Sequence, residues 1–277
     1  MGLRINTNVS ALAAMRTLGN TKQALDGTLE RLASGSRINR AGDDAAGLAI
    51  SENLRASIRG FRQAKRNAQD GVSMIQVTEG GLNEISNMII RLRELAIQAA
   101  SDTVGDKERS FTDREFQALK SEIQRISDST NFNGNPLLNG KAGIFEIQVG
   151  INNNPMNDRI VYNAENANVS LQSLGLVGES VATKVGAQTT LAALDDSLMR
   201  VNSVRADLGA MQNRLHSKIN SLAISDENLS AANSRIRDAD LALEVSDMTK
   251  NNILMQAGIS VLGQANSQAQ AALKLLN

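Results

Sequence analysis

Cysteine and tryptophan are absent from this 277-residue chain, which has one tyrosine and two prolines. Without cysteine, disulfides, thiolate chemistry and most zinc sites are excluded. Aromatic residues make up 2% of the chain and hydrophobic residues 42%, so aliphatic side chains, methionine and alanine must form the core. Basic and acidic residues number 29 each, which leaves no electrostatic footprint for nucleic acid or an anionic membrane. We expect neither among the partners.

The chain has no continuous apolar run of about 18 residues, so no bilayer-spanning segment is expected. Its start, Met1 to Asn6, lacks the basic region and apolar run of a secretory signal peptide. Export from the cell would therefore need a dedicated route.

The strongest positive signal is an apolar stripe at a spacing of seven in the C-terminal third. Its members are Leu194, Val201, Leu208, Leu215, Leu222, Leu229 and Ile236. A second stripe follows after a one-residue phase jump, with alternating spacings of four and three: Leu241, Val245, Met248, Asn252, Met255, Ile259, Leu262, Asn266, Ala269, Leu273 and Leu276. Such stripes are typical of coiled-coil seams rather than catalytic pockets.

Both ends of the chain are poor in charge. Lys274 is the only ionisable side chain from Asn251 to Asn277, and Arg16 is the only one from Ile5 to Thr21. The N-terminal stripe, with Lys22 as a polar break, consists of Met15, Leu18, Leu25, Leu29 and Leu32. Because a solvated helix needs a charged face, we expect the two ends to pair and to meet protein on more than one side.

The remaining pattern predicts a mainly α-helical fold, a long antiparallel helical rod or coiled-coil bundle with a small β-hairpin. The expected segments are a terminal coiled-coil part with connector over 1–42, a rod part over 43–173 with the hairpin at about 144–163, a short variable loop over 174–189, the second rod part over 190–237, and the second terminal part over 238–277. The long C-terminal helix is expected to begin near Thr190.

Motifs at both ends resemble those of one protein family. They are Ile5 to Asn8, Glu30 to Asn39, Asp43 to Ile50, Asn67 to Gly71, Thr78 to Ile85, Arg93 to Ala96 and Phe132 to Gly134 in the first half, and Asp238 to Asp240, Glu244 to Ser246, Gln256 to Gly258, Ser260 to Leu262 and Gln264 to Asn266 in the second. In type and separation they resemble bacterial flagellin. Leu174 to Thr190 leaves no room for an outer domain, so the chain looks like a short, core-only member.

The resemblance implies a structural subunit of the flagellar filament, used for swimming and exported through the flagellar type III channel to the extracellular filament. It implies self-association into an open helical polymer, with cap proteins, hook-junction proteins and an export chaperone as further partners. The alternative is a hook-filament junction protein, which shares flagellin-like ends. The core seam of the polymer is then expected at Leu18, Leu25, Leu29, Leu32, Leu241, Val245, Met248, Met255, Ile259, Leu262, Leu273 and Leu276.

Members of the family are also recognised by a flagellin-specific Toll-like receptor. The resemblance places Arg91, Leu95 and Glu115 at the receptor contacts, and Ile90, where receptor-active flagellins usually carry Gln, is a departure that would weaken recognition. The same three residues could instead pack neighbouring subunits, and one surface could serve both purposes.

No enzyme activity, cofactor or metal is expected. His216 stands alone outside any metalloprotease motif, and no titratable cluster suggests a cleft. Asp43, Asp44 and Glu52 are better explained by helix capping and pairing with nearby arginines than by a divalent metal. The polar residues Arg205, Gln212, Asp226 and Asn233 on the second line of the long stripe could pair laterally, or could simply face solvent.

Overall fold

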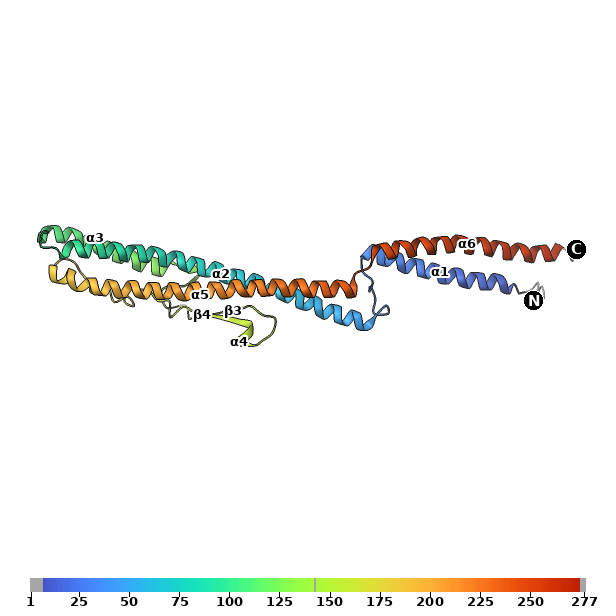
Figure 1. Cartoon of the computed structure of the whole chain (residues 1–277), viewed down its shortest axis with the longest axis horizontal. Coiled ribbons are helices and arrows are strands. Elements are labelled where there is room, and N and C mark those ends of the chain that lie inside the picture. The colour runs from blue at the N-terminus through green and yellow to red at the C-terminus, as the bar shows by residue number, and fades with distance from the viewer. Residues whose placement is uncertain (1–6, 142, 275–277) are drawn as a thin grey trace. The chain divides into compact units, whose positions relative to one another are not determined.

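The computed structural model describes residues 7–141 and 143–274, and these residues are mainly helical (Figure 1). The chain forms two compact units. The first consists of Met1–Ala56 with Asn228–Asn277, and the second of Ser57–Glu227. Both ends of the sequence therefore fold into the same unit, as the charge-poor termini predicted.

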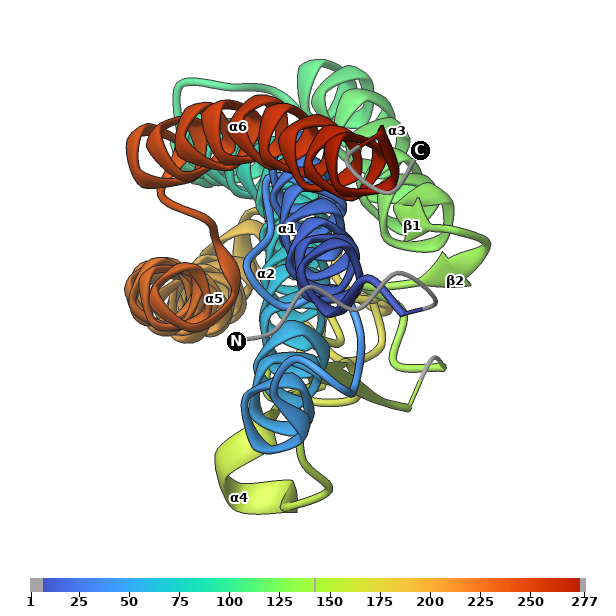
Figure 2. The same ribbon diagram turned by 90° about the vertical axis from the view of Figure 1, so that its right-hand side faces the viewer.

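The first unit is built around helices α1 (Val9–Ser34) and α6 (Leu241–Lys274), which pack antiparallel (Figures 1 and 2). The side chain of Asn8 caps α1 by accepting a hydrogen bond from the Ala11 amide, and Gly35 ends the helix with φ of 67°. Asp240 caps α6, because its Oδ1 accepts from the amides of the first turn. Local sequence thus sets both ends of the pairing region.

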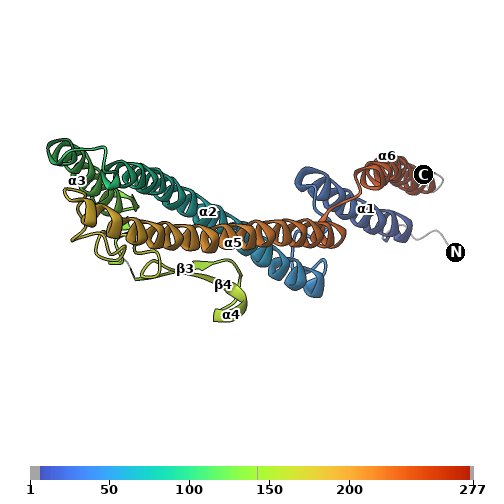
Figure 3. The same cartoon turned by 60° about the vertical axis from the view of Figure 1, so that its left-hand side comes forward.

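The second unit holds a three-helix bundle of α2 (Ala45–Ala100), α3 (Asp106–Ser129) and α5 (Lys184–Arg237), which lie side by side in Figures 1 and 3. The first turns of α2, up to Ala56, and the last turns of α5, from Asn228, belong to the first unit. Five of the seven members of the predicted stripe on α5 are buried in the second unit, all below 4% exposed: Leu194, Val201, Leu208, Leu215 and Leu222. Each such fully buried side chain stabilises the fold by roughly 1.5 to 3 kcal/mol. The last two members of the stripe, Leu229 and Ile236, belong to the first unit and are only half-buried.

Helix α5 begins at Lys184, about six residues before the expected start near Thr190. The reason is local capping, since the Thr183 hydroxyl accepts a hydrogen bond from the Gly186 amide at 3.1 Å. The glycine in this segment therefore lies inside the first turn of the helix.

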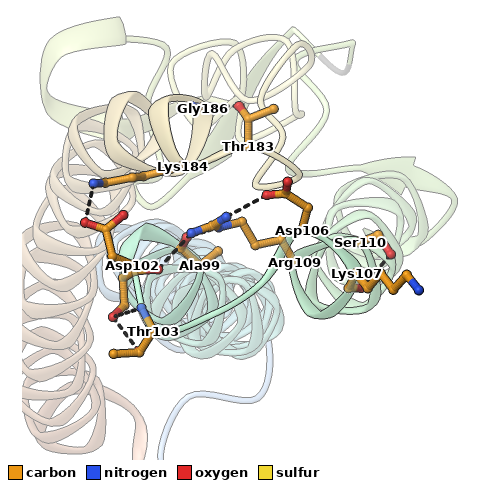
Figure 4. A network of polar contacts seen from close by, with 11 residues as sticks. Ala99, Asp102, Thr103, Asp106, Lys107, Arg109, Ser110, Thr183, Lys184 and Gly186 are labelled. Atoms are coloured by element: carbon orange, nitrogen blue, oxygen red, sulfur yellow. Dashed lines mark hydrogen bonds and ion pairs between the residues drawn. The ribbon is translucent and has the colours of Figure 1, made fainter.

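The α2–α3 turn is closed by one buried arginine (Figure 4). Arg109 is 7% exposed, and its guanidinium donates to the carbonyls of Ala99 and Ser101 and to the Asp106 carboxylate, each at 2.8 Å. The last carbonyls of a helix have no intrahelical partner and favour a positive charge. Arg109 therefore caps α2 from the helix that follows it.

In the described part of the chain, four ion pairs join α2 to α5: Glu52 with Arg237, Arg62 with Asp226, Glu79 with Arg205, and Arg93 with Asp195. Asp102, in the turn that follows α2, pairs with Lys184 at the start of α5. The sign on α2 alternates along the helix, so sliding one helix to the next pair would place like charges opposite one another. Arg205 and Asp226 are thus paired laterally, which was one of the two roles left open for them, while Gln212 is half-buried.

Two small hairpins complete the second unit. Strands β1 (Asn131–Phe132) and β2 (Asn135–Pro136) meet across a turn in which Asn133 and Gly134 have φ of 51° and 81°. The expected larger hairpin consists of β3 (Ile144–Gln148) and β4 (Arg159–Asn163), joined through the short helix α4 (Pro155–Asp158).

The larger hairpin packs against α2 at positions where that helix has small residues. A Cβ atom on Gly71 would lie 2.6 Å from the Ile147 side chain, and one on Gly60 would lie 2.7 Å from Ile151. Asn67 donates to the Gln148 carbonyl at 3.0 Å. Glycine in a helix costs stability, and here it permits the close approach of a strand.

The only tyrosine, Tyr162 on β4, is buried in this core at 4% exposed and stacks on Phe145. Burial raises its pKa to about 12. Since an unfolded tyrosine ionises near pH 10, the unfolded state binds fewer protons between about pH 10 and 12. The contribution of Tyr162 to the free energy of unfolding, about 2 to 3 kcal/mol, is therefore complete below pH 10 and lost as the pH rises towards 12.

We predict that the phenolate absorbance of the folded chain rises with a midpoint near pH 12, and that denaturant returns the midpoint to about 10. The signal is unambiguous because the chain has no second tyrosine and no tryptophan. Helicity recorded in parallel provides the control. A midpoint near 10 with helicity intact would show that Tyr162 is not buried.

Candidate interaction surfaces

Helices α1 and α6 contact each other along one narrow stripe on each. On α1 the stripe contains the buried residues Ala11, Leu25 and Thr28, and on α6 it contains half-buried residues at alternating spacings of four and three: Met248, Asn251, Met255, Gly258, Leu262 and Ala265. Gly258 permits close packing, since a Cβ there would lie 3.2 Å from the Leu18 side chain. Small and polar residues therefore occupy much of this contact.

The contact leaves many large apolar side chains exposed on both helices. On α1 they are Val9, Leu12, Met15 and Leu29, and on α6 they are Leu241, Leu243, Val245, Ile253, Leu254, Ile259 and Val261, all at least 45% exposed. Exposed apolar surface of this extent marks a site of interaction with other protein.

Some of the residues expected to form the core seam lie in the α1–α6 contact, and others lie on the exposed apolar surface. Leu25 is buried between the helices, and Leu18, Leu32, Met248, Met255 and Leu262 are half-buried. Leu29, Leu241, Val245 and Ile259 are exposed. Leu273 has no described side chain, and Leu276 lies outside the described residues. The two helices alone thus cover only part of the expected seam.

Sequence reasoning missed several members of the α1–α6 contact: Asn251, Gly258 and Ala265, each one position before a predicted seam residue, and one charged residue, Glu244. Glu244 is 8% exposed, and its Oε1 lies 3.0 Å from Nε of Arg31. An acidic residue is seldom buried unless it is paired, so the seven-residue pattern alone gave no reason to place it here. Its spacing of four from Met248 is the signal that could have placed it on the contact stripe.

The acidic residues near the start of α2 are engaged by the chain itself. Asp44 caps the helix by accepting from the Gly47 amide at 2.8 Å, which confirms the capping interpretation. Asp43 accepts from the amides of Asn39 and Arg40, and these bonds lower its pKa. Glu52 pairs with Arg237 and Arg55, which lower its pKa. Within 7–141 and 143–274, no three acidic or histidine side chains gather to hold a metal ion.

The structure brings Arg91 and Glu115 together, whereas Leu95 is not part of the exposed surface. Arg91 donates from Nε and Nη2 to Oε1 of Glu115 at 3.0 and 2.9 Å, and from Nη1 to Glu94 at 2.9 Å. Hydrogen bonds to Glu94 and Glu115 raise the pKa of Arg91. Leu95 is 2% exposed because it packs into the bundle core.

Two apolar residues in this part of α2, Ile90 and Ile97, are exposed. They are seven residues apart, and so lie on one face of α2. Arg91, Glu94 and Glu115 thus form an exposed charged cluster, whereas Leu95, four residues from Arg91 on α2, is buried in the core. Elsewhere, His216 is exposed on α5, and none of the described helices is long and apolar enough to cross a membrane.

Comparison with known proteins identifies the family from both ends of the chain. The family model for the bacterial flagellin N-terminal helical region matches residues 5–142, and the model for the C-terminal helical region matches residues 191–276. These matches cover α1, α2, α3 and α6, and α5 from residue 191 onward.

Curated relatives match over nearly their whole length. A flagellin of Halalkalibacterium halodurans is 44% identical over 272 residues, which are 98% of this chain and 99% of the relative. A flagellar filament 30.7 kDa core protein of Treponema maltophilum is 44% identical over 288 residues, 99% of each chain. A flagellin of Bacillus subtilis is 42% identical over 305 residues, 99% of this chain and all of the relative.

Solved structures agree with this assignment. The crystal structure of Bacillus cereus flagellin matches with a TM-score of 0.51 at 31% identity, covering 57% of this chain and 88% of that one. A putative flagellar hook-associated protein of Vibrio parahaemolyticus matches with a TM-score of 0.58, covering 71% of this chain and 100% of that one, but at 14% identity it shows a shared fold alone. On the family models and the near full-length relatives, this chain belongs to the bacterial flagellin family.

Proposed function

We propose that this chain is a structural subunit that polymerises with copies of itself into the bacterial flagellar filament. The observation that carries the proposal is the exposed apolar surface of α1 and α6, on a chain whose curated relatives are flagellins and filament core proteins. A hook-filament junction role is not favoured, because those relatives match over nearly the full chain and the hook-associated likeness extends to fold only.

The terminal unit couples its own folding to assembly. Burying an exposed apolar side chain such as Leu241 or Ile259 stabilises by about 2 kcal/mol, whereas ordering each residue of a helix costs about 1 to 2 kcal/mol. One pair of helices with one narrow contact stripe cannot offset that cost. Contacts from several neighbouring copies can, so the ends fold fully only in the polymer.

The bundle of α2, α3 and α5 acts as the rod of the subunit. In this proposal residues 43–173 and 190–237 form the rod, and 1–42 with 238–277 form the terminal coiled-coil domain. Residues 174–189 are a short variable segment, whose last part, from Lys184, is the start of α5. A head-to-tail contact between copies produces an open helical polymer when the rotation between successive copies does not close into a ring. With separate surfaces for axial and lateral neighbours, such a polymer grows without a defined length. No reaction, cofactor or metal is part of the function.

Family membership supports the remaining assignments. The subunit is exported through the flagellar type III channel and resides in the extracellular filament, where cap and hook-junction proteins and an export chaperone are further partners. The Arg91–Glu115 surface is the contact with the flagellin-specific Toll-like receptor and with a lateral neighbour. Because the same surface contacts a lateral neighbour in the filament, polymerisation hides it from the receptor.

We predict that Ile259→Asp abolishes filaments while the second unit stays folded. Ile259 is 57% exposed, so the substitution costs little in the free subunit, whereas in the polymer it buries an unpaired carboxylate at several kcal/mol in every copy. Electron microscopy and circular dichroism measure the two effects. Val177→Asp is the matched control, because Val177 is an exposed aliphatic residue too but lies in the loop before α5. This substitution should leave filaments unchanged. Normal filaments from Ile259→Asp would refute the polymer-core role of this residue.

We predict that Arg91→Ala or Glu115→Ala lowers receptor activation by the free subunit about tenfold and disturbs filament packing or motility. The Arg125–Glu122 pair on α3 is a matched exposed ion pair, and Arg125→Ala should leave both unchanged. Intact filament should activate the receptor far less than free subunit at equal subunit concentration, as read by a cell reporter. Equal potency of the two forms, with depolymerisation excluded, would show that the surface is not buried between copies.

A further inference from the structure

Two chain segments far apart in sequence meet where α1 ends and α6 begins. Ser36 lies opposite Asp238 in an isolated antiparallel bridge. The Arg37 amide donates to the Arg237 carbonyl at 2.6 Å, and the Ala239 amide donates to the Gly35 carbonyl at 3.0 Å. These two hydrogen bonds fix the segments relative to one another by main-chain groups alone.

Arg37 also bonds the opposite segment through its side chain. Its Nη2 donates to the carbonyl of Ile236 at 2.8 Å. Ile236 lies in the last turn of α5, where carbonyls lack intrahelical partners and a positive charge is favourable. Arg37 thus holds this segment at two points, once by its amide and once by its guanidinium.

The bridge stands at the start of a register that continues along the whole pair of helices. From Ser36 and Asp238, the contacts pass through Arg31 with Glu244, then Leu18 with Gly258, and end at Asn8, whose Nδ2 donates to the Ala265 carbonyl at 2.9 Å. Between successive contacts α1 and α6 advance by nearly equal numbers of residues. The register set at the bridge is therefore kept to the far end.

Polar contacts are needed to fix the register of α1 against α6, because the apolar contact between the two helices specifies that register only weakly. Hydrophobic burial is not directional, and a heptad stripe shifted by one heptad keeps its pattern. The α6 stripe also contains Gly258 and Ala265, which interlock little with α1. Hydrogen bonds from Arg37 to two named carbonyls exclude such shifts.

We propose that Arg37 is a positioning residue that sets the register of α1 against α6. By doing so it presents the exposed apolar residues of both helices to neighbouring copies in a single arrangement. The inference rests on the proposed function, because register affects activity only in a subunit that must stack on identical copies. Arg37 acts through the bridge and is not itself a contact to the next copy.

The test compares Arg37→Ala with Arg40→Ala in the full chain. Arg40 is a matched control, an exposed arginine of the same connector that pairs with Glu30. Arg37→Ala removes the guanidinium bond to Ile236 and keeps the main-chain bond to Arg237. It should raise the critical concentration for seeded polymerisation at least about tenfold, the loss expected for one hydrogen bond made by a charged group. Arg40→Ala should stay within about twofold. Thermal unfolding of the bundle should be the same in both.

A disulfide rescue separates register from general damage. Ser36 and Asp238 are a non-hydrogen-bonded antiparallel pair, whose Cα atoms approach to about 4.5 Å, within the range a disulfide spans. The chain has no cysteine, so Ser36→Cys with Asp238→Cys supplies the only thiols. Added to Arg37→Ala, the pair should restore polymerisation when oxidised and not when reduced.

Two results would overturn the proposal. One is normal polymerisation of Arg37→Ala, and the other is a locked, oxidised Arg37→Ala variant that still fails to polymerise although the same disulfide is tolerated with Arg37 present. If the unsubstituted chain formed no filaments under these conditions, the proposed function would fall, and the role of Arg37 in register with it.

Discussion

A pair of helices can bury only one stripe of each other, and the terminal unit has more apolar surface than that stripe accommodates. The stripe between α1 and α6 is occupied by alanine, threonine and glycine as well as by leucine and methionine. Larger aliphatic residues such as Ile253 and Ile259 point away from it. The stability of the ends, the preference for an open polymer and the need for a defined register all follow from this surplus.

The bundle of the second unit satisfies the same constraint within one chain. There α2 packs against both α3 and α5, and the β3–β4 hairpin covers part of α2 near Gly71. The core is aliphatic apart from a few rings such as Phe116, so it depends on regular helix spacing rather than on large aromatic contacts. Arg109 closes the turn, and alternating ion pairs favour one alignment of α2 and α5.

Much of this arrangement could be predicted because heptad spacing and capping residues are local signals. The buried stripe of α5, the break after Ala100 and the larger hairpin were all found from spacing and turn residues. The family resemblance alone suggested that Arg91, Leu95 and Glu115 share a surface, and neither the Arg91–Glu115 ion pair nor the burial of Leu95 was anticipated. Adjacent helical positions differ in exposure according to which neighbour they face, and a single sequence does not specify the neighbour.

Long-range polar contacts were the main features that sequence reasoning missed. The bridge between Ser36 and Asp238 joins segments from opposite ends of the chain, and Glu244 is buried only because Arg31 lies opposite it. Neither segment has a propensity that predicts the other. Similarly, the phase of the α6 stripe is decided by which residues are small enough to approach α1, a property that emerges only from the pairing.

The central claim is that the exposed apolar residues of α1 and α6 become buried between copies. Hydrogen–deuterium exchange of the free subunit and the assembled filament, measured at one pH, tests it directly. Amides from Leu241 to Val261 should exchange at least about a hundredfold more slowly in the filament, while core amides of α5 near Leu208 should be protected in both forms. Equal exchange of the α6 amides in the two forms would contradict it.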